Sequence, residues 1–119
     1  MTDSSPSPAE KAAERYVEVA TADGKGKLAD LFAEDAVFHN PAGGIVSGRE
    51  EIRAFYERFL KDYTPEFHIA RMVASGDQCW IELANGERSA PDLLAANHFE
   101  VDEEGLIARL VVFVRPRGG

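Results

Sequence analysis

The sequence is short of cysteine, and it has no long apolar run and no cluster of basic residues. Its one cysteine, Cys79, excludes an internal disulfide, and the apolar neighbours Trp80 and Ile81 indicate a buried structural thiol. No stretch approaches the roughly 18 apolar residues that a membrane span needs. The opening MTDSSPSP also lacks the basic and apolar regions of an export signal. These absences predict a cytoplasmic protein with no membrane partner.

Positive charge is also scarce, since 21 acidic residues against 13 basic ones give a formal net charge of -8. No group of lysines and arginines could follow a phosphate backbone, so we expect no nucleic-acid partner. The three histidines, His39, His68 and His98, are scattered without the short spacing of metal ligands. No serine or cysteine lies in a recognisable nucleophile motif. We therefore expect no metal site and no cofactor.

The chain has 119 residues, of which 45% are apolar, and this is enough for one buried core but not for two. We expect a single domain over residues 1–119, with residues 1–7 disordered. Three helices are predicted in the first half. The first begins near Pro8 and turns Tyr16 towards the core, the second is short and passes through residues 28–32, and the third follows a capping box at residues 47–50.

Alternation with a period of two predicts the strands. Residues 36–39 form a short strand that leads into a glycine-rich, flexible loop. Four more strands are expected after residue 65, at residues 66–74, 77–86, 91–101 and 105–115. The fold class is therefore α+β, with three N-terminal helices packed on a curved, mostly antiparallel sheet.

Two asparagines interrupt the apolar faces of these strands. Asn40 shares the parity of Ala36 and Phe38, and Asn97 lies between apolar residues of its own face. An unpaired amide on a buried face costs about 1–3 kcal/mol, so a local partner or a ligand must satisfy it. Both residues are candidates for one pocket. The alternatives are that Asn40 starts a turn before Pro41 and that Asn97 bonds to backbone at a bulge.

Four segments carry a resemblance to a known family. They are Arg15-Tyr16-Val17, the stretch from residue 31 to Asn40-Pro41, residues 47–56, and Asn97-His98-Phe99. In this order they resemble the ketosteroid isomerases of the NTF2-like or SnoaL-like superfamily. The resemblance covers nearly the whole chain and implies an NTF2-like cone-shaped barrel. It also implies a homodimer, because many relatives pair through the exposed face of the sheet.

The resemblance implies a Δ5-3-ketosteroid isomerase, which shifts a double bond from Δ5 to Δ4 by proton transfer. In that family a tyrosine and a protonated carboxylic acid donate hydrogen bonds to the keto oxygen, while a separate aspartate carries the proton. By position, Tyr16 matches the tyrosine, Asn97 the acid and Asn40 the general base. The implied substrate-binding residues are Phe32, Tyr56, Phe99 and Phe113. Without the resemblance, the helical spacing of Tyr16 and Tyr56 favours core tyrosines with satisfied hydroxyls.

Asn40 departs from the family pattern in a way that affects the chemistry. An amide has no useful basicity near neutral pH, so isomerisation is expected to be impaired. His39 has the opposite strand parity and Asp35 lies at the start of the strand, so neither is well placed to substitute. Asn97 can still donate its N–H to an oxyanion.

The sequence leaves open whether Asn40 arose by natural divergence or replaces the aspartate of a working isomerase. Two alternatives to an isomerase also stay open. One is a noncatalytic NTF2-like protein that binds a hydrophobic ligand, and the other is a SnoaL-like polyketide cyclase.

Overall fold

The structure is a computed structural model that describes residues 7–22, 25–61, 65–90 and 92–115. Its six strands form one sheet in the order β2-β1-β6-β5-β4-β3. The helical elements are α1 (Pro8–Thr21), α2 (Lys25–Leu28), the 3-10 helix η1 (Ala29–Leu31) and α3 (Arg49–Phe59). The strands are β1 (Phe32–His39), β2 (Ile45–Ser47), β3 (His68–Ser75), β4 (Gln78–Asn85), β5 (Asp92–Val101) and β6 (Ile107–Val114).

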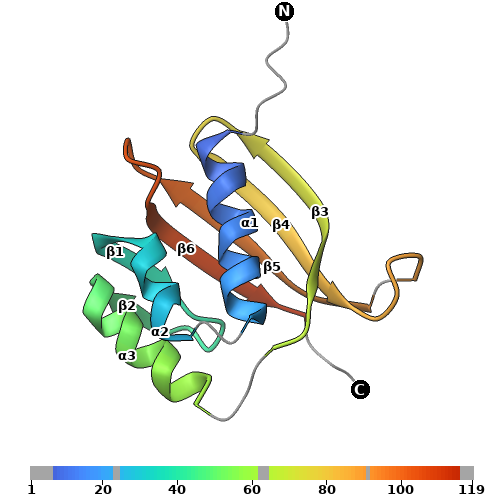
Figure 1. The fold of residues 1–119 in the computed structure, drawn as a ribbon, viewed down its shortest axis with the longest axis horizontal. Coiled ribbons are helices and arrows are strands. Elements are labelled where there is room, and N and C mark those ends of the chain that lie inside the picture. The colour runs from blue at the N-terminus through green and yellow to red at the C-terminus, as the bar shows by residue number, and fades with distance from the viewer. Residues whose placement is uncertain (1–6, 23–24, 62–64, 91, 116–119) are drawn as a thin grey trace, which may run out of the picture.

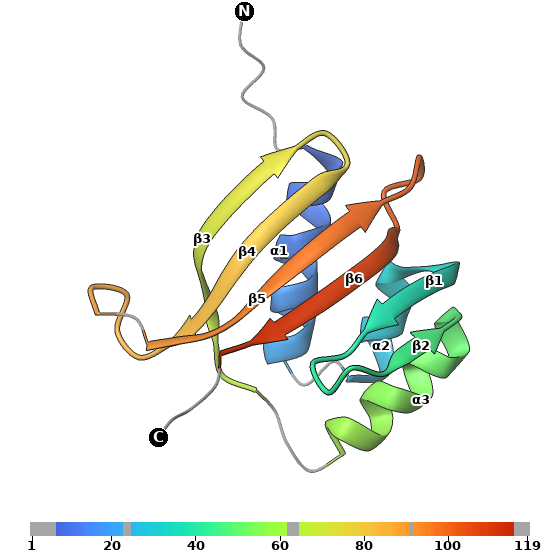
Figure 2. The same ribbon diagram turned by 180° about the vertical axis from the view of Figure 1, so that it is seen from behind.

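The sheet is mixed, because β1 and β6 pair in parallel while every other neighbouring pair is antiparallel. Figure 1 shows α1 lying across the middle of the sheet and α2 and α3 beside β1 and β2. Figure 2 shows the opposite face of the sheet, which no described helix covers. The α+β class and the curved, mostly antiparallel sheet are thus confirmed. Disorder was expected for residues 1–7, of which residues 1–6 lie outside the described residues and Ser7 is the N-cap of α1.

Helix α1 begins where the sequence predicts. Ser7 caps it, because its side-chain oxygen accepts a hydrogen bond of 3.2 Å from the backbone N–H of Glu10. The buried face of the helix consists of four alanines and one large side chain, Tyr16. Small alanine side chains let the helix backbone approach the sheet closely. Tyr16 is therefore the side chain that projects from α1 into the space between helix and sheet.

The prediction of three helices, the second of them short, is confirmed only for the first and the third. Among the described residues only α1 and α3 are longer than one turn. The expected second helix is the single α-helical turn Lys25–Leu28 followed by the 3-10 turn Ala29–Leu31. Phe32 was expected at the end of this helix, but it is the first residue of β1 and pairs with Ile107 of β6. Strand pairing with a distant segment therefore overrides the local helical spacing.

The loop expected before α3 contains the short strand β2, which pairs with β1 from Val37 to His39. Ser47 belongs to this strand, so it does not cap the helix as predicted. The N-cap is Gly48, which has φ 93° and gives no side-chain cap. The direct turn from β2 into α3 has this positive φ, which glycine adopts without strain. The Gly48 N–H donates to the carbonyl of Ala36 at 2.8 Å, which holds the turn against β1.

The last four strands begin and end within two residues of their predicted bounds. Their side chains alternate between the face covered by helices and the bare face. Cys79 lies on the covered side of β4 and is fully buried, which confirms the predicted structural thiol. Burial raises the pKa of this thiol to about 11, and the nearby carboxylates of Glu10 and Glu14 add to the rise.

Candidate functional site

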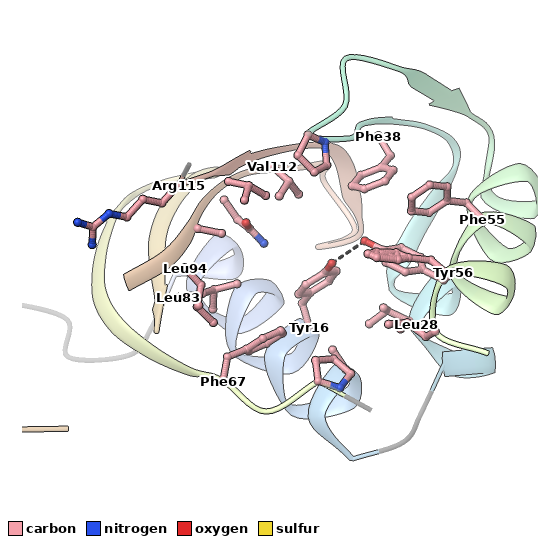
Figure 3. A pocket seen from close by; sticks show the side chains of 18 residues that line it. Tyr16, Leu28, Phe38, Phe55, Tyr56, Phe67, Leu83, Leu94, Val112 and Arg115 are labelled. Carbon is pink, nitrogen blue, oxygen red and sulfur yellow. Dashed lines mark hydrogen bonds between the residues drawn. The ribbon is translucent and has the colours of Figure 1, made fainter. Parts of the chain in front are cut away.

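A cavity of about 290 Å³ lies between α1, α3 and the covered face of the sheet (Figure 3). This volume is at the small end of the range for small-molecule pockets, roughly 300–1,000 Å³. Its lining is apolar except for Tyr16, Tyr56, Asn97 and Arg115. Figure 3 shows the Arg115 side chain extending away from the cavity. Three neutral polar side chains and a hydrocarbon wall therefore define the interior.

Tyr16 of α1 and Tyr56 of α3 meet across the cavity. Their hydroxyl oxygens are 2.5 Å apart, and the two side chains point towards one another in Figure 3. Both residues are at most 6% exposed. Either hydroxyl can be the donor. Because two hydroxyls carry two protons and their mutual bond uses one, the pair keeps one O–H for a ligand.

Two predicted substrate-binding residues, Phe32 and Phe99, hold the tyrosines in place. The ring of Phe99 meets Tyr16 edge-on, with the ring centroids 5.3 Å apart. Phe32 packs against Tyr16 and Tyr56 with centroid distances of 6.4 and 6.3 Å. Both phenylalanines are fully buried, and neither is among the side chains that line the cavity. Their structural role is to fix the position of the two hydroxyls.

Burial keeps both tyrosines neutral at physiological pH. It raises the pKa of Tyr16 to about 12, and the hydrogen bond from Tyr56 offsets only part of this rise. Burial also raises the pKa of Tyr56 well above 10, and the proximity of Tyr16 adds to the effect. Neither hydroxyl can therefore act as a base near pH 7, but both retain the proton that a hydrogen-bond donor needs.

We expect the raised pKa values to make the protein less stable in alkaline solution. Above pH 10 the unfolded chain loses the phenolic protons while the folded chain retains them, so the free energy of unfolding falls as the pH rises. The loss should approach about 1.4 kcal/mol per pH unit for each tyrosine between about pH 10 and 12. Urea unfolding over this range measures it. The double variant Tyr16→Phe/Tyr56→Phe is the control, and an equally steep decline in that variant would contradict the assignment.

Asn97 lies on β5 and lines the same cavity, with only 2% of its surface exposed. It pairs in regular register with Ile81 on one side and Val112 on the other. The irregular steps of these ladders lie at other residues, so the bulge alternative is wrong. Among the described residues, the side-chain oxygen Oδ1 of Asn97 has no hydrogen-bond partner. Native proteins rarely leave such a buried atom unpaired.

Asn40 has a different environment from Asn97. Its Oδ1 accepts hydrogen bonds from the backbone N–H groups of Ala42 and Gly44, at 2.8 and 3.4 Å. A backbone bond of 2.9 Å from its own N–H to the Gly44 carbonyl closes the same loop. Pro41 lines the cavity and Asn40 does not. The turn alternative from the sequence is therefore confirmed, and the amide oxygen is used by the loop.

No carboxylate or imidazole lines the cavity within the part of the chain that the structure describes. Asp35 is exposed, and His39 lies on the opposite parity of β1 from Phe38, which does line the cavity. The described residues also contain no group of three or more histidine, cysteine, aspartate or glutamate side chains placed to hold a metal ion. No described helix is long and apolar enough to cross a membrane.

Phe113 lies on the bare face of the sheet and does not line the cavity. It is 52% exposed and stacks on Trp80, with the ring centroids 5.9 Å apart. Its neighbours Val112 and Val114 line the cavity instead, so the structure does not bring Phe113 together with the other site residues, and its substrate-binding role stays a prediction. Trp80 also stacks on His98 at 4.5 Å, which places three rings side by side on this face. The homodimer implied by the resemblance stays a prediction, and this aromatic surface is where it would form.

Sequence reasoning missed most of the apolar wall. Phe38 and Phe55 line the cavity, and their rings are 5.2 Å apart. Phe38 follows Ala36 at the spacing of an inward strand face, and Phe55 follows Ile52 at helical spacing. Those patterns identify buried positions, but they do not separate a cavity wall from a filled core.

The family model of the SnoaL-like domain matches residues 13–110. The chain belongs to the SnoaL-like domain family. The matched segment runs from α1 to β6 and includes Tyr16, Tyr56 and Asn97. No curated protein matches the chain.

Two solved structures are similar to this SnoaL-like domain. An NTF-2 like protein of unknown function from Burkholderia xenovorans LB400 is 16% identical, with a TM-score of 0.74 over 94% of this chain and 86% of that one. A protein of unknown function with a cystatin-like fold from Methylobium petroleophilum PM1 is 21% identical, with a TM-score of 0.71 over 94% and 78%. At these identities the likeness shows the fold alone. This SnoaL-like domain therefore has an NTF2-like α+β fold with a curved, mixed sheet of six strands.

Proposed function

We propose that this SnoaL-like domain binds a flat, mostly apolar ring compound of the steroid type, with the ligand's polar group next to Tyr16, Tyr56 and Asn97. The observation that carries the proposal is the convergence of these three buried polar side chains in an otherwise apolar cavity. Small-molecule sites typically combine an apolar wall with a few polar groups that fix the ligand's orientation. The tyrosine pair, braced by Phe32 and Phe99, provides such a fixed group.

A second candidate function is the isomerisation of a Δ5-3-ketosteroid. The tyrosine pair favours it, because a neutral buried O–H can stabilise a developing oxyanion. The reaction also needs a group that moves a proton from one carbon to another. Asn40 cannot do this, and its amide oxygen is held by two backbone N–H groups. Binding without efficient turnover is therefore the better-supported function, and isomerisation is expected to be impaired.

A polyketide cyclase is the third candidate, and membership of the SnoaL-like family is compatible with it. Such an enzyme would be expected to use an acid–base side chain in the cavity. The described lining residues provide tyrosines with raised pKa values and an outward-pointing arginine. This set supports binding more directly than it supports proton transfer.

A paired assay tests binding and isomerisation together. We expect the chain and its Asn40→Asp variant to bind a phenolic steroid with similar affinity, because an aspartate oxygen can accept the same two loop hydrogen bonds. Enone formation from a Δ5-3-ketosteroid is measured on both proteins. Turnover in the variant alone supports an isomerase cavity that lacks its base. Binding without turnover in either protein supports the binding function and not isomerisation. The absence of binding in both proteins overturns the proposal.

A further inference from the structure

The lining residues of the cavity differ in their exposure to solvent. The two tyrosines are at most 6% exposed, so their hydroxyls lie at the inner end. The exposed residues of the lining are Pro41, Phe59, Val114 and Arg115, and these mark the mouth. At about 290 Å³ the cavity is at the small end of the range for ligand pockets. A fused-ring ligand would therefore fill it and present its outer end at the mouth.

Arg115 directly follows β6, and the sheet fixes its position at the mouth. Its backbone N–H donates to the carbonyl of Leu94 at 2.9 Å, and Leu94 itself lines the cavity. Val112 lines the wall three residues earlier, so at roughly 3.3 Å per strand residue the chain runs about 10 Å from this wall position to Arg115. Figure 3 shows the arginine side chain pointing outward. A group on the outer end of a fused-ring ligand is thus within its reach.

The guanidinium of Arg115 is the one ionised group among the described residues that line the cavity. No residue in the described part of the chain forms a hydrogen bond or an ion pair with it. By contrast, Arg15, Arg53 and Arg71 pair with carboxylates at 2.7, 2.8 and 3.8 Å. Glu82 lines a shallow hollow that Arg115 also borders, but its ion pair is with Arg71. In a chain with 21 acidic residues and 13 basic ones, this cation is left available to a ligand.

We infer that the natural ligand carries a carboxylate at the outer end of its ring system, and that the guanidinium of Arg115 binds this group at the mouth of the cavity. A planar guanidinium can donate two parallel hydrogen bonds to a carboxylate. Because the carboxylate stays in contact with water at the mouth, it avoids the desolvation that the neutral interior would impose. The inference rests on the proposed binding function and adds the class of ligand, an apolar ring compound with an acidic tail.

Two nearly isosteric probes measure the contribution of the charge. One is a 3-ketosteroid with a carboxylic acid on carbon 17, at the opposite end of the rings from the ketone, and the other is its primary carboxamide. Only the acid is charged at neutral pH. We expect it to bind about threefold to tenfold more tightly than the carboxamide in a calorimetric titration at low ionic strength, because exposed charge pairs contribute modestly. Added salt should reduce this ratio, since it screens exposed charges.

Variants at Arg115 decide whether this residue is the source of the preference. We expect the ratio of acid to carboxamide affinity to fall to about one in Arg115→Gln, and Arg115→Glu should reverse the preference. Arg109→Gln is the matched control, because it removes the same charge from β6 at a residue that does not line the cavity. The ratio should stay as in the parent in this variant. Circular dichroism checks that all three variants fold.

The outcomes separate the inference from the function on which it rests. If neither probe binds, the proposed function is overturned and the inference fails with it. If the carboxamide binds at least as tightly as the acid, only the inference is overturned. A preference for the acid that persists in Arg115→Gln also overturns it, because another group would then recognise the carboxylate. Equal loss of the preference in Arg109→Gln overturns it as well, because the preference would then follow the net charge of the protein.

Discussion

The variant Phe32→Ala should lower the free energy of unfolding by about 3–5 kcal/mol, because it removes a fully buried ring and leaves a void in the core. Phe32 packs against Tyr16 and Tyr56 and is also the first residue of β1, where it pairs with Ile107. The void would open beneath both cavity tyrosines. For a domain whose total stability is about 5–15 kcal/mol, this loss is a large fraction. Urea unfolding followed by circular dichroism measures the change.

Phe113→Ala is the matched control, since it deletes the same side chain from the bare face of the sheet. Phe113 is 52% exposed and its described ring contact is the stack on Trp80, so we expect a loss of about 1 kcal/mol or less. Steroid affinity should not change, because Phe113 does not line the cavity. Similar losses in the two variants would contradict the positions that the structure gives these residues. A large drop in ligand affinity in Phe113→Ala would restore the channel role expected from the sequence.

The second large effect concerns the hydrogen bond between Tyr16 and Tyr56. Tyr16→Phe or Tyr56→Phe alone removes one partner and leaves the other hydroxyl buried without its bond. We expect each single variant to lose about 1–3 kcal/mol of unfolding free energy. In the double variant no hydroxyl is left unpaired, so its loss should be smaller than the sum of the two single losses.

A double-mutant cycle measured by urea unfolding gives the coupling energy of the pair directly, and we expect about 0.5–3 kcal/mol. The same cycle can be repeated with a bound phenolic steroid. The hydroxyl left in each single variant then has the ligand as a partner, so the coupling energy should shrink. Strictly additive losses in the free protein would mean that the two hydroxyls do not depend on one another, which is incompatible with a 2.5 Å contact in a buried site.

Local patterns in the sequence predicted most of the elements but not how distant segments pair. Alternation of apolar and polar residues was sufficient to predict strands β3 to β6, and the capping residue Ser7 was sufficient to predict where α1 begins. Both signals depend on residues within one element. Strand β2 and the early start of β1 depend on pairing with segments elsewhere in the chain. Three glycines between Pro41 and Arg49 suggested a flexible loop, and the sequence contains no local sign of these pairings.

The candidate site was predictable to the extent that side-chain parity determines which way a residue points. Helical spacing predicted that Tyr16 and Tyr56 point inward, and strand parity predicted the same for Asn97. In the structure these three side chains line one cavity. Parity failed for Asn40 because the strand ends at His39 and the residue enters a turn. The position of Phe113 was taken from the family resemblance, whereas Val112 and Val114 have the parity that reaches the cavity.

The parallel pairing of β1 with β6 makes the proposed ligand binding depend on both ends of the described chain. The cavity walls come from Tyr16 near one end of the sequence and from Val112 and Val114 near the other. During synthesis the helices and β1 are complete long before β6 leaves the ribosome, and contacts between such distant segments form late and slowly. A nascent chain therefore cannot retain ligand until its last strand docks. Once β6 has docked, a bound compound would stabilise all the elements together, by an amount that grows with the logarithm of the ratio of its free concentration to its dissociation constant.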